Sequence, residues 1–146
     1  MKEYIKDYIL DGLADMKGEY ISLDDLPNLI YQNDMATGSI TCDRKKAQDF
    51  NHAHEHEFAC AMKYLDGVCT GMGNNISKLY FDNPEKAMCY LVATYVDVVV
   101  SRFLSVYHCD FDWDCKITVD QAFIDHWTEN IEFIINEVFN EMDDLA

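Results

Sequence analysis

Residues 118–142 read TVDQAFIDHWTENIEFIINEVFNEM, and this stretch decides the fold class. Its apolar residues recur at steps of three and four, which is the period of a helix that buries one face. They are Phe123, Trp127, Ile131, Ile134, Ile135, Val138 and Met142. Thr118 and Gln121 have the spacing of a capping box, so we expect the helix to begin there. The stretch predicts a long amphipathic helix.

A second long helix is expected from Pro84 to about Tyr107. Asn83 is a good capping side chain, and a proline is favoured at the first helical position. The β-branched run Val96 to Val100 would also suit a buried strand, but the segment is several times longer than a usual strand, which favours a helix. Charges at Asp97 and Arg102 interrupt its most apolar part. We therefore expect a core helix rather than a membrane span.

Two further helices are expected in the first half of the chain. From Lys2 to Met16 the apolar residues have helical spacing, and Gly18 can end that helix in the left-handed conformation. From Cys42 to Cys69 there is little Gly or Pro, which favours a helix with a break near Asn51. The glycine-rich residues 67–73 mark its end.

The segment between those two helices is expected to be mostly irregular. Ser22 and Asp25 resemble a capping box with a short acid in place of Glu. Pro27 follows closely, and proline is disfavoured inside a helix. We therefore expect a short helical piece that ends near Tyr31 and a loop over residues 33–39.

These elements together predict an all-α fold. No internal repeat, low-complexity tract or tight Asn-Gly or Asp-Gly hairpin turn is present. We expect residues 1–146 to form a single acidic helical domain, a bundle of about four to five helices. Ile40 is a candidate for a short extended segment.

The chain is strongly acidic. Its 27 Asp and Glu residues outnumber 11 Lys and Arg residues, which gives a formal net charge of −16. Such a surface repels nucleic-acid phosphates and anionic lipid and attracts basic surfaces. We therefore expect a basic protein partner, and no direct binding to nucleic acid or to membranes.

The cysteines and the N-terminus indicate the cytosol. The first sixteen residues mix lysine with acids, unlike a secretory signal. Six cysteines contain no CxxC pair, and in a domain of this size without an export signal they indicate reduced thiols. They are Cys42, Cys60, Cys69, Cys89, Cys109 and Cys115.

The negative charge is concentrated in residues 103–146, where eleven acids face a single lysine. In the last predicted helix, acids at helical spacing share one face and stand about 5 to 6 Å apart. DNA carries one charge per about 3.4 Å on each strand, so the row approaches a phosphate-like density. The face holds Asp125, Glu129, Glu132 and Asn136, flanked by Glu137 and Glu141. We predict that these acids bind the partner.

The preceding segment alternates acids with large aromatic residues. Asp110, Asp112 and Asp114 have the spacing of the first half of a calcium loop. However, the sixth position is cysteine where glycine is needed, and the twelfth is glutamine where glutamate closes the site. We therefore predict partner contacts for these three acids and Trp113, with Phe111 beside them. Packing of the two aromatic side chains into the core is the alternative.

A histidine-rich run offers possible metal ligands. His52, His56 and Cys60 are spaced by four and would line one face of a helix, a set that could hold zinc. The metalloprotease pattern H-E-x-x-H fails because Phe58 stands in place of the second histidine. The simpler interpretation is an inward-packed Cys60 with histidines that pair with neighbouring acids. P-loop, nucleophile-elbow and dinucleotide-binding patterns are missing, so neither an enzyme nor a cofactor is expected.

Part of the sequence resembles small proteins encoded by bacteriophages and prophages. The resemblance lies in Leu26–Asp34 (LPNLIYQND), Gly38–Thr41 (GSIT) and the helix that contains Ala47. Size, acidity and helical character are also similar to phage inhibitors of bacterial defence, notably anti-CRISPR and antirestriction proteins, some of which imitate DNA. The resemblance implies a protein that occupies the basic nucleic-acid channel of a CRISPR effector or restriction enzyme.

Other functions remain open at this stage. A sponge for a signalling nucleotide would need cations around phosphates, and Arg44-Lys45-Lys46 is the basic cluster that could supply them. A metal-dependent enzyme would be built around His52, His56 and Cys60. A general acidic protein-interaction module would need neither.

Overall fold

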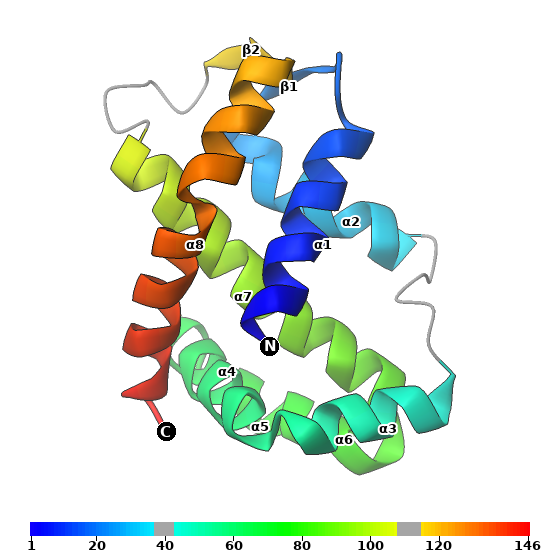
Figure 1. The fold of residues 1–146 in the computed structure, drawn as a ribbon. Coiled ribbons are helices and arrows are strands. Elements are labelled where there is room, and N and C mark those ends of the chain that lie inside the picture. The colour runs from blue at the N-terminus through cyan, green and yellow to red at the C-terminus, as the bar shows by residue number, and fades with distance from the viewer. Residues whose placement is uncertain (37–42, 108–114) are drawn as a thin grey trace.

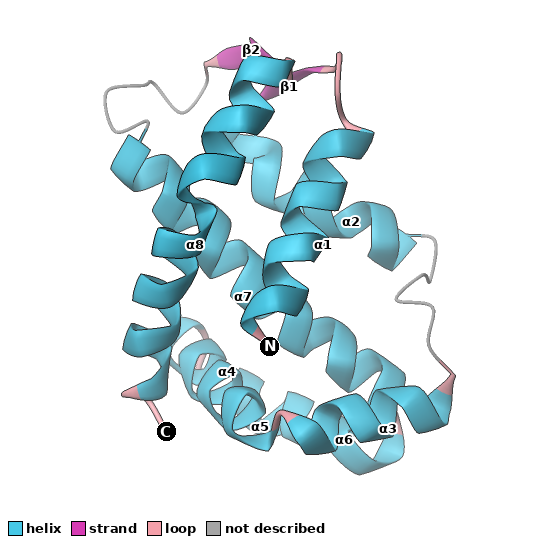
Figure 2. Ribbon diagram, viewed as in Figure 1, coloured by secondary structure: helices cyan, strands magenta, loops and turns pink. Residues whose placement is uncertain are grey.

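The computed structural model describes residues 1–36, 43–107 and 115–146 and is mostly helical (Figure 1, Figure 2). The first elements are α1 (Lys2–Asp15), β1 (Tyr20–Ser22), the 3-10 helix η1 (Leu23–Asp25), α2 (Leu26–Ala36), α3 (Arg44–Ala53) and α4 (Glu55–Val68). They are followed by α5 (Met72–Ser77), α6 (Leu79–Asp82), α7 (Pro84–Tyr107), β2 (Lys116–Thr118) and α8 (Gln121–Asp143). The all-α class is confirmed, with more helices than the four to five predicted.

Helix α7 is the centre of the fold and contacts every other α-helix among the described residues. It begins as predicted, because Asn83 Oδ1 accepts a hydrogen bond from the backbone nitrogen of Lys86 at 3.2 Å. The β-branched run is helical, which confirms the length argument. By length and composition α7 could cross a membrane, but 61% of its most apolar window is buried inside the protein. It is a core helix.

Helix α8 buries the predicted apolar face. Trp127 is fully buried and stacks on Phe103 of α7, with ring centroids 3.6 Å apart. The predicted capping box is wrong, because Asp120 is the capping residue and accepts from the backbone nitrogen of Phe123 at 2.9 Å. Thr118 is instead paired with Tyr20 in the sheet, so the chain turns into the helix two residues later.

Helix α1 lies antiparallel to α8 in Figure 1. Near its start, Lys2 donates to Asn136 Oδ1 at 3.0 Å, and just beyond its end Lys17 donates to Gln121 Oε1 at 2.7 Å. Gly18 has φ +90°, the left-handed conformation predicted for the end of this helix. The two helices therefore form one side of the molecule.

A small antiparallel sheet was missed by the sequence analysis. Strand β1 pairs with β2 in the register Tyr20 with Thr118, Ile21 with Ile117 and Ser22 with Lys116. Each strand has three residues, and they are distant in sequence, so no hairpin signal marks them. The predicted extended segment at Ile40 lies outside the described residues.

The helix end that was predicted near Tyr31, because Pro27 is disfavoured inside a helix, is wrong. Pro27 is the second residue of α2, in the first turn, where helical backbone nitrogens have no carbonyl partner within the helix and a proline costs little. The helix therefore continues past Tyr31 to Ala36, into the start of the predicted 33–39 loop. The remainder of that loop lies outside the described residues.

The middle of the chain breaks at His54 rather than Asn51, between α3 and α4. Asn51 is instead buried and donates to the Pro84 carbonyl at 3.0 Å, which joins α3 to the start of α7. The glycine-rich segment 67–73 does end α4, as predicted, but α5 also begins within it, at Met72. A Cβ atom on Gly73 would lie 2.1 Å from the Met62 carbonyl oxygen, so glycine is required where α5 packs against α4.

Candidate functional site

The first half of α8 displays three carboxylates to solvent. Asp125, Glu129 and Glu132 are all exposed, on the side of the helix away from Trp127. Asp125 accepts a hydrogen bond from Gln121 Nε2 at 2.8 Å. Asn136 continues the row toward the C-terminus, where Lys2 binds it. These three acids lie together on one face of the helix, as the spacing predicted.

Helix α1 carries a second acidic row that the sequence analysis did not identify. Glu3, Asp7, Asp11 and Asp15 are spaced by four and are all exposed. They lie opposite the buried apolar side of α1. The signal was present as a strict four-residue repeat of acids, but the analysis followed only the apolar residues of that helix.

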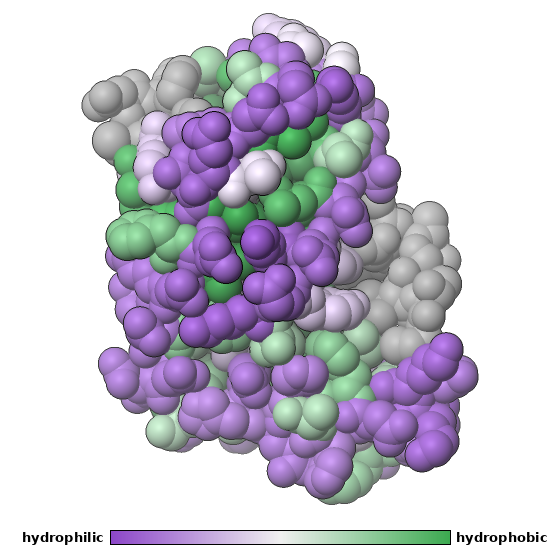
Figure 3. Space-filling view, in the orientation of Figure 1, coloured by the Kyte–Doolittle hydropathy of each residue, from purple (hydrophilic) through white to green (hydrophobic). Residues whose placement is uncertain are grey.

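The two rows lie on neighbouring helices, and together we call them the acidic face. It comprises Glu3, Asp7, Asp11 and Asp15 of α1 with Asp125, Glu129 and Glu132 of α8. Figure 3 shows α1 and α8 in front, with hydrophilic residues over both and apolar residues visible between them. No salt bridge to these seven carboxylates is found within the described parts of the chain.

The charge density of this face can be compared with that of DNA. Acids four residues apart on a helix are about 6 Å apart along its axis, so two rows supply about one charge per 3 Å. Duplex DNA carries one charge per about 1.7 Å of axis when both strands are counted. The acidic face therefore has roughly half the linear charge of a duplex. Lys2 and Lys17, which donate hydrogen bonds to side chains of α8, lower the negative charge density of this face further.

An exposed aromatic side chain lies next to the acids of α8. Phe133 is 63% exposed, follows Glu132 directly and is four residues from Glu129. An apolar side chain outside the buried stripe of an amphipathic helix has no core to fill. Aromatic residues surrounded by polar groups are frequent anchors of protein interfaces.

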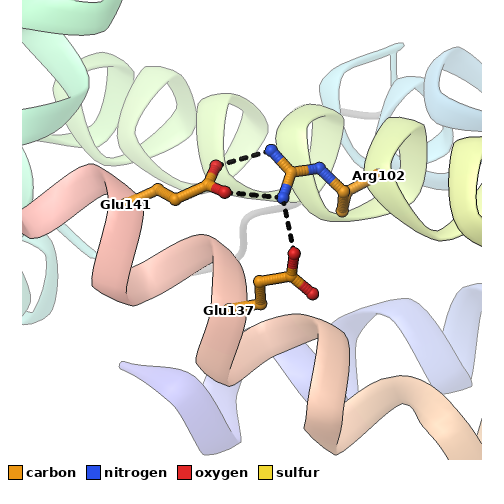
Figure 4. A network of polar contacts seen from close by, with 3 residues as sticks. All are labelled: Arg102, Glu137 and Glu141. Atoms are coloured by element: carbon orange, nitrogen blue, oxygen red, sulfur yellow. Dashed lines mark hydrogen bonds and ion pairs between the residues drawn. The ribbon is translucent and has the colours of Figure 1, made fainter.

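The two flanking acids of α8 have a different environment (Figure 4). Arg102 of α7 donates from Nη1 to Glu137 at 3.1 Å and to Glu141 at 2.8 Å, while its Nη2 bonds the second oxygen of Glu141. These hydrogen bonds hold the pKa of the Glu141 carboxyl below its usual value. Partner binding by Glu137 and Glu141 stays a prediction, but part of their charge is already neutralised within the chain.

The other predicted contact residues cannot be placed. Asp110, Asp112, Trp113 and Asp114 lie outside the described residues, as does Phe111. Their role in partner binding therefore stays a prediction.

The histidine-rich run does not bring together the predicted set. His52 points to Glu55, with Nδ1 and Oε1 2.8 Å apart, and its side chain is 80% exposed. His56 instead lies beside Cys60 and Asp143, whose ligand atoms are all within 4.8 Å of one another. His52 is therefore not part of the alternative ligand set, because α3 ends between His52 and His56 and the helical spacing is broken. The simpler interpretation, an inward-packed Cys60 with histidines that pair with acids, is confirmed for His52 and His56. Asp143, 83 residues after Cys60, could not be found from sequence spacing.

The basic cluster has other contacts. Arg44 donates to the backbone carbonyls of Phe81 and Asp82 at 3.1 and 3.5 Å, and so joins α3 to α6. Lys45 lies 3.5 Å from Asp49. A nucleotide-binding role for this cluster stays a prediction, and two of its three cations have partners within the chain.

Two surface hollows accompany these groups. The larger, about 380 Å³, is bordered by Arg102, Glu141 and Tyr64 and therefore lies beside the ion pairs of Figure 4. The other, about 230 Å³, contains Asp97, and burial raises the pKa of that carboxyl. Its other lining side chains are mainly tyrosine and apolar residues.

No known protein family matches this sequence, and neither a curated protein nor a solved structure matches it.

Proposed function

We propose that this protein binds a basic, nucleic-acid-binding surface of another protein through the acidic face and keeps nucleic acid from that surface. The supporting observation is the set of seven exposed carboxylates on α1 and α8 without a salt-bridge partner among the described residues. Such unpaired acids attract a cationic receptor over about one Debye length, roughly 8 to 10 Å at physiological salt.

The form of the face favours a protein groove as the receptor. Two parallel rows of acids can form ion pairs with two rows of lysine or arginine, which in the receptor normally bind the two strands of a duplex. Phe133 would add an apolar contact at the edge of the charged area, which supplies affinity that salt does not screen. Grooves that bind single-stranded nucleic acid likewise combine cationic and aromatic side chains.

The resemblance to phage inhibitors supplies the class of target. A CRISPR effector or restriction enzyme in the bacterial cytosol has a basic channel of this type, and its occupation would inhibit the nuclease. This protein would then act as an inhibitor without catalysis of its own.

The test uses two triple variants with equal charge. One reverses Asp125, Glu129 and Glu132 to lysine, and the control reverses Asp24, Asp49 and Asp82, which are exposed and outside α1 and α8. Each changes the formal net charge from −16 to −10. A partner is captured from bacterial lysate and identified by mass spectrometry, and its Kd is then measured for wild type and both variants.

We expect the α8 variant to weaken binding at least 100-fold, or about 2.7 kcal/mol, while the control stays within about threefold. Duplex DNA should displace the protein from its partner. Equal weakening by both variants would show that net charge alone is recognised, and failure of DNA to compete would place the contact on another surface. Either result would overturn the proposal.

A further inference from the structure

Three potential metal ligands meet where the end of α8 lies against α4. His56 Nε2 is 3.6 Å from Cys60 Sγ and 3.1 Å from Asp143 Oδ1. His56 and Cys60 are one turn apart on α4, while Asp143 is the last residue of α8. The cluster therefore joins two helices that are far apart in sequence.

These distances are close to those of a tetrahedral zinc centre. With Zn–S near 2.3 Å and Zn–N and Zn–O near 2.0 to 2.1 Å, tetrahedral angles place sulfur about 3.6 Å from nitrogen, and nitrogen about 3.3 Å from oxygen. Two edges of the ligand triangle therefore already have nearly the required length. The third, from sulfur to oxygen, is within 4.8 Å. Rotation of the half-exposed Asp143 side chain can shorten it.

The same nitrogen of His56 makes both contacts, and this argues against a Cys-His-Asp catalytic triad. In a triad the acid binds one ring nitrogen and the nucleophile binds the other, so that the ring can pass a proton. Here three ligand atoms converge on one point instead.

The surroundings favour a bound cation. The carboxylates of Asp143 and Glu57 both lie close enough to the Cys60 sulfur to interact with it electrostatically. A cation at this point would offset both charges and bind the thiolate, with the thiol proton released to water. Tyr95, which is stacked on Phe139 at 4.6 Å, interacts with the Cys60 sulfur and donates its hydroxyl to the Glu57 carbonyl at 3.5 Å. A hydrogen-bonded outer residue of this kind orients a metal ligand.

The geometry points to a zinc site formed by His56, Cys60 and Asp143, with water in the fourth position, that fastens the end of α8 to α4. Thiolate and imidazole ligands favour zinc over magnesium and calcium, which prefer oxygen. His56 and Asp143 are 58% and 49% exposed, so the ion would lie at the surface with its open position toward solvent. This site is separate from the acidic face and does not depend on its function.

The test measures metal binding by the full chain without a purification tag. The protein is treated with chelator, reduced, and titrated with zinc chloride, and bound zinc is counted after gel filtration. Cobalt chloride serves as a second probe, because a thiolate ligand gives cobalt a charge-transfer absorption in the near ultraviolet. Wild type should bind one ion per chain, show this absorption, and have a Tm several degrees higher with zinc.

Each ligand has a matched control in the chain. Cys60→Ser should abolish the cobalt–thiolate band, whereas Cys69→Ser, at an exposed cysteine, should keep it. His56→Gln and Asp143→Asn should each weaken zinc binding at least tenfold. His52→Gln and Asp144→Asn, at exposed positions outside the triangle, should change it less than twofold.

Several results would overturn the site. The first is less than one tenth of a zinc ion bound per chain. The second is a cobalt–thiolate band that persists in Cys60→Ser. The third is an equal loss of zinc affinity in a ligand variant and in its control. Far-ultraviolet circular dichroism checks folding. If Cys60→Ser is unfolded, the comparison of His56→Gln with His52→Gln decides the question, because both side chains are largely exposed.

Discussion

The two halves of α8 carry the same kind of side chain at the same helical spacing, yet their surroundings differ. In the first half Asp125, Glu129 and Glu132 face solvent, and no described residue forms a salt bridge with them. In the second half Arg102 holds Glu137 and Glu141, and His56 contacts Asp143. An acid at helical spacing therefore has no fixed role. Its role depends on which neighbouring helix supplies a partner.

The largest expected effect concerns the buried side of the first half, where Trp127 packs into the core. Trp127→Ala should lower the free energy of unfolding by about 3 to 5 kcal/mol, because it removes a fully buried ring that stacks on Phe103. Phe133→Ala, at an exposed aromatic of the same helix, should change it by less than about 0.5 kcal/mol. Urea denaturation measures both. A large loss in Phe133→Ala would mean that this ring is needed for folding.

The next prediction reverses the charge of two acids in each half of α8. Asp125→Lys with Glu129→Lys should weaken partner binding about tenfold or more, with little effect on Tm. Glu137→Lys with Glu141→Lys should lower Tm, because two new cations would face Arg102, and should change binding less. Calorimetry and binding assays on the same samples compare them. Equal binding losses would show that both halves contact the partner.

A smaller effect is expected when the cation between α7 and α8 is removed. Arg102→Met keeps most of the apolar stem and leaves two carboxylates unpaired, so the free energy of unfolding should fall by about 1 kcal/mol. The loss should shrink at high salt. Lys86→Met, at an exposed lysine of α7, is the control and should have no measurable effect. The same loss in both variants would show that the Arg102 contacts add nothing.

The smallest effect is a pH dependence confined to the second half. Arg102 lowers the pKa of Glu141 in the folded protein relative to its usual value of 4.5. This contact therefore stabilises the protein above about pH 4.5 and is lost as the pH falls through the lower folded value. Glu141→Gln should cost a few tenths of a kcal/mol at pH 7 and progressively less as the pH falls below about 4.5. A loss in Glu141→Gln that stays constant from pH 7 to low pH would contradict the assignment.

The sequence analysis succeeded where the signal was repeated along the chain. The bounds of α7 and the buried face of α8 follow from many apolar residues at one period, so a single exception does not change the result. It failed where one residue had two possible roles. Pro27 was interpreted as a helix limit but lies in a first turn, and Thr118 was interpreted as a cap but belongs to a strand.

The candidate sites also differ in whether their residues come from one helix or from two. The acids of α8 were found because they lie on one helix, and those of α1 could have been found by the same spacing rule. The third ligand beside His56 and Cys60 could not, because Asp143 is brought there by the packing of α8 against α4.

What the sequence alone determined is the helical class, the long helices and the large negative charge, since periodicity and charge are properties of neighbouring residues. The tertiary structure decided which acids have partners: Arg102 reaches two of them, His56 reaches Asp143, and the acidic face has no such salt bridge among the described residues. The physical reason is the distance over which each feature is set. A helix sets spacing along one axis, whereas an ion pair or a metal site requires atoms within about 4 Å, and only packing between helices fixes such distances.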